Sequence, residues 1–171
     1  MGRKELRDLA ISELVVAMVF GIAVSGGFYV LTKLQSFIRT LMIAFFSVSL
    51  GFILHELGYC YYTRRFGCNV FYKRRTMALG LALVYSLFGF VFTARGSVEI
   101  YPGRDESGYI YINKSRASIF ALAGQAMNLL LAILFVILNY AFPTFILSQF
   151  FVISSNINTC LSIFNLISGP Y

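Results

Sequence analysis

Long apolar runs dominate the pattern of hydrophobic and polar positions along the chain. A membrane span needs about 20 mainly apolar residues to cross about 30 Å of hydrocarbon. Five runs are candidates for this role: Leu9–Leu31, Phe37–Tyr62, Thr76–Ala94, Ala117–Phe142 and Thr144–Ile167. The third is the weakest candidate. It is rich in Gly and Phe, so the alternative is a re-entrant segment shielded from lipid by protein. The polar residues at 154–156 are expected to break the last run.

A short polar stretch between the third and fourth runs has the pattern of a β-hairpin. Val98 and Ile100 precede a turn bounded by Gly103 and Gly108, and the run 109–112 alternates Tyr and Ile. Short β-branched and aromatic runs around such a turn are typical of paired strands. The sequence therefore predicts an all-α integral membrane protein, a single domain over 1–171. It has about five transmembrane helices, with a re-entrant third segment as the alternative, and a surface hairpin over 98–112.

Composition supports a membrane location. The chain is 58% hydrophobic and 12% charged, whereas a soluble domain is about 45–50% apolar and about 25% charged. The net charge is +7, and the basic residues cluster at the edges of the apolar runs, as in membrane anchoring. No motif for nucleic-acid binding accompanies them. We expect a multi-pass protein surrounded by lipid, in the cell membrane if the source is a prokaryote. The distribution of Lys and Arg favours a cytoplasmic N-terminus only slightly.

The second run carries the candidate chemistry. His55 and Glu56 occupy the first two positions of a His-Glu-x-x-His pattern. On a helix, positions i and i+4 share a face, so two such histidines would bind one zinc ion while the glutamate acts as general base on the metal-bound water. Here position i+4 is Tyr59, and the chain has no other histidine. We take His55 as the metal-ligand position, Glu56 as the catalytic position and Tyr59 as the degenerate ligand position.

The segments around this pattern resemble the site-2 protease family, which are intramembrane zinc metalloproteases. Ser49–Tyr59 followed by 64–68 resembles the family's motif helix and the basic turn after it. The segment 86–98 resembles a stretch ending in Ala-Pro-Gly-Ala-Val, with Arg95 in place of the proline. Ala123–Leu129 resembles the Ala-Gly-Pro-x-x-Asn helix start, with Gln125 in place of the proline. The resemblance covers the chain from about Phe37 onward, and each motif departs from the family at a defining position.

The last motif bears on zinc binding. Ile163–Ile167 resembles the family's Asn-Leu-x-Pro segment, which leads to Leu-Asp-Gly and the aspartate that is the third zinc ligand. The chain reaches Tyr171 before that aspartate, and every acidic residue lies at or before Glu106. The resemblance implies zinc as the family's cofactor. A catalytic zinc needs three protein donors and a water, so we expect no stable zinc here and a catalytically inactive homologue.

Two asparagines complete the expected site. Asn128 and Asn165 match family asparagines near the catalytic centre, so the resemblance implies contact with substrate; the alternative is an interhelical hydrogen bond. The hairpin would offer an edge to an unwound substrate strand, or would simply connect two helices. We expect a protein that binds membrane-anchored peptides or helices. Two alternatives stay open: an active enzyme that takes ligands from a partner or a further C-terminal segment, and an unrelated small multispan membrane protein.

Overall fold

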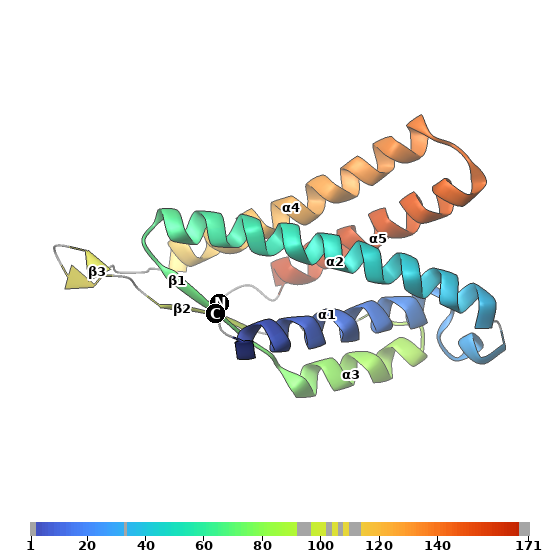
Figure 1. Ribbon diagram of the computed structural model, residues 1–171, viewed down its shortest axis with the longest axis horizontal. Coiled ribbons are helices and arrows are strands. Elements are labelled where there is room, and N and C mark those ends of the chain that lie inside the picture. Colours follow the sequence, from blue (N-terminus) through green and yellow to red (C-terminus); the bar gives the residue numbers. More distant parts are fainter. Residues whose placement is uncertain are drawn as a thin grey trace.

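Helices make up most of the molecule. The computed structural model describes residues 3–32, 34–91, 97–101, 104–105, 108–109 and 114–167. Figure 1 shows the arrangement of its helices, which include one 3₁₀ helix, η1 (Gly27–Thr32). The α-helices are α1 (Arg3–Val24), α2 (Leu34–Arg65), α3 (Thr76–Leu87), α4 (Lys114–Ala141) and α5 (Phe145–Ile167).

Three of these helices are long and apolar enough to cross a membrane, namely α2, α4 and α5. The expected first span, Leu9–Leu31, is interrupted because α1 ends at Val24. Gly26 and Gly27 then take positive φ angles of 92° and 65°. The third expected span forms a helix of only 12 residues, about 18 Å long, which is too short to cross about 30 Å of hydrocarbon. The prediction of five spanning helices is therefore reduced to three.

The expected break in the last run does not occur, because α5 is continuous through residues 154–156. Two of its serines, Ser155 and Ser162, hydrogen-bond to backbone carbonyls of α4. Ser155 Oγ donates to Ala132 O at 3.1 Å, and Ser162 Oγ donates to Gln125 O at 3.2 Å. Both pairs are seven residues apart on their own helices and run in opposite directions. The polar residues therefore fix the antiparallel register of α4 and α5.

Replacing Ser155 or Ser162 by alanine is expected to lower stability modestly. Hydrogen bonds between helices in a membrane contribute about 0.6 kcal/mol on average and at most about 1.7 kcal/mol. Unfolding in mixed detergent and SDS micelles measures the loss. Ser36→Ala, at an exposed position on α2, is the matched control and should leave the unfolding midpoint unchanged. Equal midpoints for all three variants would contradict a role for these serines in the pairing.

The strands differ from the expected hairpin. β1 (Asn69–Lys73) pairs antiparallel with β2 (Ser97–Tyr101), with Asn69 opposite Tyr101 and Lys73 opposite Ser97. β3 (Arg104–Asp105) and β4 (Gly108–Tyr109) form a separate pair of two residues each. The predicted pairing of 98–100 with 109–112 is therefore wrong for the described residues, because β2 finds its partner before α3 instead. Residues 110–112 lie outside the described part.

Helix α2 lies at the centre of the helical packing. It contacts α1 on one side and both α4 and α5 on the other, while α3 packs against α1 (Figure 1). A buried apolar cluster joins α1, α2, α3 and α5: Val16, Ala17, Phe20, Ala44, Val48, Leu79, Ile157 and Leu161. The Ser49 hydroxyl donates a hydrogen bond to Glu13 Oε1, which links α2 to α1. This packing holds the helix that carries His55 between neighbours on both sides.

Candidate functional site

Glycines let α2 and α4 approach closely where His55 lies. A Cβ added to Gly58 on α2 would lie 2.9 Å from Met127 Cγ and 3.0 Å from Ala123 O. A Cβ on Gly51, two turns earlier, would lie 2.2 Å from Asn158 Oδ1 on α5. Small residues at helix interfaces allow this kind of backbone approach in membranes. The candidate site is therefore a narrow seam between α2 and α4, closed on one side by α5.

The imidazole of His55 lies in this seam against Gly124 of α4. A Cβ added to Gly124 would lie 2.7 Å from His55 Cε1, 2.8 Å from Nδ1 and 2.9 Å from Nε2. The part of the ring that carries both nitrogens therefore meets the backbone of α4, and Nδ1 is buried. The structure thus brings His55 into contact with the segment 123–128, which resembles the Ala-Gly-Pro-x-x-Asn motif. In the sequence, the two regions are related only by the order in which the family's motifs occur.

The other two positions of the His-Glu-x-x-His pattern lie on the same helix. Tyr59 is one turn after His55 and only 5% exposed, while Glu56 is half-buried. The Thr63 hydroxyl donates to the Tyr59 carbonyl at 2.7 Å, a bond within the helix that involves the backbone of Tyr59 and not its phenol. A buried phenol thus stands where the pattern would place a second imidazole.

The described residues do not fit a catalytic zinc ion. No group of three or more His, Cys, Asp or Glu side chains that could hold a metal occurs within the described ranges. His55 is the chain's sole histidine, and Tyr59 offers a phenol in place of the imidazole that zinc sites use. Cys60 is adjacent in sequence but lines a groove on the outer face of α2. One imidazole and one half-buried carboxylate fall short of the three donors that a catalytic site requires.

Buried amides lie one helical turn away from His55. Asn128 on α4 is fully buried, and neither its Oδ1 nor its Nδ2 has a hydrogen-bond partner in the described structure. A Cβ on Gly51 would lie 3.4 Å from Asn128 Oδ1 and 2.2 Å from Asn158 Oδ1, so the two amide oxygens converge on the same point of α2. A buried polar group without a partner costs about 1–3 kcal/mol. A water molecule or a ligand can supply the missing partner.

Sequence reasoning missed Asn158. This side chain is fully buried, and its Nδ2 donates to Ser154 O at 2.9 Å and approaches Ser47 Oγ at 3.5 Å. A signal was present, since Ser154, Asn158 and Asn165 recur at intervals of four and seven residues and so share one face of a helix. Asn165, the expected substrate-binding residue, lies on α5, but its side chain is outside the described part.

The chain is similar to one curated protein over almost its whole length. It is 30% identical over 171 residues to "Putative zinc metalloprotease MJ0611" of Methanocaldococcus jannaschii. The alignment covers 99% of this chain and 80% of that protein. No family model matches the chain, and no solved structure matches it.

Proposed function

This chain belongs to the zinc metalloprotease family of MJ0611, and from that premise we propose that it binds membrane-anchored peptides or helices without hydrolysing them. The relationship runs through 99% of the chain, so the alternative of an unrelated small membrane protein is set aside. The order and spacing of the motifs support placing this family among the site-2 proteases. In this proposal α2, α4 and α5 each cross the membrane, so the protein is multi-pass, and the chain acts as a single domain.

One observation carries the proposal: Tyr59 is buried at the position of the second imidazole. Even the loss of an outer partner of a metal ligand typically costs 10–100-fold in affinity or activity. Loss of a ligand itself removes a donor that a water-bearing zinc needs. Without a polarised water, Glu56 has no proton to abstract in the reaction that the family name implies. The replacement of the second histidine by Tyr59 lies within α2, so this argument does not depend on where the chain ends.

The seam supports the binding half of the proposal. A transmembrane peptide that unwinds exposes backbone N–H and C=O groups, which must be satisfied inside the membrane. The Asn128 amide carries one acceptor and two donors, and it is buried one helical turn away from His55 without a partner among the described residues. Asn128 is the side chain that we expect to hydrogen-bond a bound peptide, and Asn165 is a further candidate on α5.

Zinc content and proteolysis test the catalytic half. The purified protein is expected to hold substoichiometric zinc, and its action on a membrane-anchored peptide should equal that of Glu56→Gln. Tyr59→His restores one donor and should raise zinc retention above that of the unaltered chain, without reaching full catalysis. Stoichiometric zinc in the unaltered chain, together with cleavage that Glu56→Gln abolishes, would instead establish an active enzyme whose remaining ligands come from a partner or a further segment.

Peptide binding is tested separately with Asn128→Leu. Loss of the amide should weaken binding of a fluorescent transmembrane peptide in bicelles by about tenfold, since one hydrogen bond to a buried group contributes about 1–2 kcal/mol. The same change removes an unpartnered polar group, so the protein should be at least as stable as before. Asn156→Leu, at an exposed position on α5, is the control. Equal peptide affinities for the two variants would exclude Asn128 from the binding site.

A further inference from the structure

Basic residues gather at one end of the molecule. Helix α1 begins there, α2 ends there, and α4 starts beside them (Figure 1). Arg74 Nε lies 3.9 Å from Asp8 Oδ1, and the rings of Phe66 and Phe120 lie 5.4 Å apart, so these segments do meet. The basic residues at this end are Arg3, Lys4, Arg7, Arg64, Arg65, Lys73, Arg74, Arg75, Lys114 and Arg116. At the opposite end, the described part carries only Arg39.

This asymmetry is much larger than the sequence count implied, because α3 is too short to span. The expectation of five spans divided the basic residues almost evenly between the two sides. The fold instead places most of them together, and an excess of Lys and Arg marks the cytoplasmic side of a membrane protein. The cytoplasmic leaflet is also the one that carries anionic lipid and attracts basic segments near the membrane.

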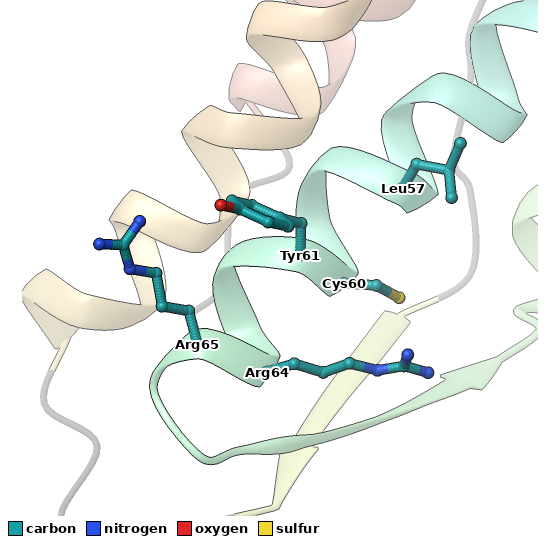
Figure 2. Close-up of a pocket in the computed structure, with 5 residues that line it drawn as sticks. All are labelled: Leu57, Cys60, Tyr61, Arg64 and Arg65. Atoms are coloured by element: carbon teal, nitrogen blue, oxygen red, sulfur yellow. The ribbon is translucent and has the colours of Figure 1, made fainter.

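A groove on the outer face of α2 lies at this basic end. It has a volume of about 640 Å³ and is lined by Leu57, Cys60, Tyr61, Arg64 and Arg65, all of them on the last turns of one helix (Figure 2). Figure 2 shows the two arginine side chains extending to different sides of the helix end. The only carboxylate on α2 is Glu56, which is not among the lining residues. Within the described part, neither guanidinium has an ion pair.

The length of α2 places this groove at headgroup level. Its 32 residues extend about 48 Å, whereas the hydrocarbon core is about 30 Å thick and the bilayer with headgroups about 40–45 Å. The arginines are the last two residues of the helix, and Tyr61 is a residue type enriched at the membrane interface. One and two turns deeper on the same face, Leu57 and Ile53 are 59% and 54% exposed, which provides an apolar track for an acyl chain.

We propose that this groove binds an anionic phospholipid of the cytoplasmic leaflet. The guanidinium group of Arg64, which extends to the same side of the helix as Cys60 and Leu57 (Figure 2), binds the phosphate, because arginine donates paired hydrogen bonds to phosphate oxygens. Arg65, on the other side of the helix end, adds positive charge that attracts the anionic headgroup. An acyl chain then lies along Leu57 and Ile53. The site is distinct from the seam that holds His55, and it depends neither on zinc nor on the binding of a peptide.

The chain's lack of tryptophan allows a local test. Tyr61→Trp places a single fluorophore in the groove, and Tyr140→Trp places one at an exposed position near the end of α4. Each variant is reconstituted into vesicles that contain phosphatidylglycerol or phosphatidylcholine with brominated acyl chains at the same mole fraction. Fluorescence of the Tyr61→Trp variant should be quenched more strongly by brominated phosphatidylglycerol, and that of the Tyr140→Trp variant should be quenched equally by the two lipids.

Charge variants show whether the preference belongs to the groove. In the Tyr61→Trp background, Arg64→Gln with Arg65→Gln should reduce the preference for phosphatidylglycerol by about 30-fold, since each basic residue near an anionic surface contributes about 1 kcal/mol. Arg3→Gln with Arg7→Gln removes the same charge from the same end and should leave the preference largely intact. Equal losses would show only a diffuse attraction of the basic end, and this result would overturn the proposal.

Two further results would also overturn it. If inorganic phosphate at millimolar concentration abolishes the preference, then the groove takes a soluble anion rather than a lipid. If the Tyr61→Trp variant is quenched equally by the two brominated lipids, then the groove holds no anionic lipid at all. Circular dichroism and size-exclusion chromatography of each variant establish that the helices are retained, so that loss of the preference reports on binding and not on folding.

Discussion

Gly27→Ala is expected to lower the free energy of unfolding by about 2–5 kcal/mol. Gly27 has a φ of 65°, and a Cβ there would lie 2.2 Å from Leu87 O and 2.9 Å from Gly89 N. Overpacking against a well-packed site costs about 1–3 kcal/mol, and the left-handed backbone costs an L-residue about 1–2 kcal/mol more. The backbone atoms at the end of α3 cannot rotate away as a flexible side chain would.

Gly80→Ala is the matched control for this substitution and should raise the free energy of unfolding. It lies within α3, and a Cβ there would meet no atom within 4 Å. Alanine is more favourable than glycine in a helix interior by about 0.8–1.0 kcal/mol. Unfolding midpoints in one mixed-micelle series compare the two variants directly. If Gly27→Ala were as stable as the unaltered protein, then α3 would not pack its end against Gly27.

Gly51→Ala is expected to cost about 2–4 kcal/mol and to be rescued by a second change. Its Cβ would lie 2.2 Å from Asn158 Oδ1, and the Asn158 side chain is fully buried and held by Ser154 O. Moving the amide breaks that hydrogen bond in addition to the overpacking cost. Asn158→Ala removes the clash, so the double variant should be more stable than the sum of the two single changes predicts. A coupling above about 1 kcal/mol is expected for residues in direct contact.

Gly58→Ala supplies the control for this coupling. A Cβ there would meet Met127 Cγ at 2.9 Å and Ala123 O at 3.0 Å. Methionine adapts its shape more readily than a hydrogen-bonded amide, and the carbonyl contact is longer than the 2.2 Å approach at Gly51. The cost should be smaller, and Asn158→Ala should not reduce it. Rescue of both glycine variants by Asn158→Ala would show a general loosening of the helices rather than a specific contact between Gly51 and Asn158.

The long helices follow from the sequence because hydrophobicity over about 20 residues is a local property. Phe37–Tyr62 falls within α2, and Ala117–Phe142 matches α4 to within one residue at its end. The first and third runs failed for a different reason. Their hydropathy extends past glycines whose positive φ angles end the helices, at Gly26 and Gly27 after α1 and at Gly89 after α3, and an average over a window does not register such points.

The candidate site was only partly accessible to sequence reasoning. Helical spacing places His55 and Tyr59 one turn apart on α2 without any knowledge of the fold. The contact between His55 and Gly124 depends on the register of two helices that are distant in sequence, and no local pattern encodes it. The same holds for β2, because its partner β1 precedes α3 in the sequence whereas β2 follows it. A local turn signal favoured pairing of β2 with the residues that come after it.

The buried ring of Tyr59 has a consequence for the Tyr59→His substitution. A phenol is larger than an imidazole, so a histidine at this position would free space in the seam rather than demand it. The overpacking cost that a larger side chain would bring does not arise for this substitution. The fold thus has room for a second nitrogen donor one turn from His55, and among the described residues a zinc site would then need a third donor rather than more space.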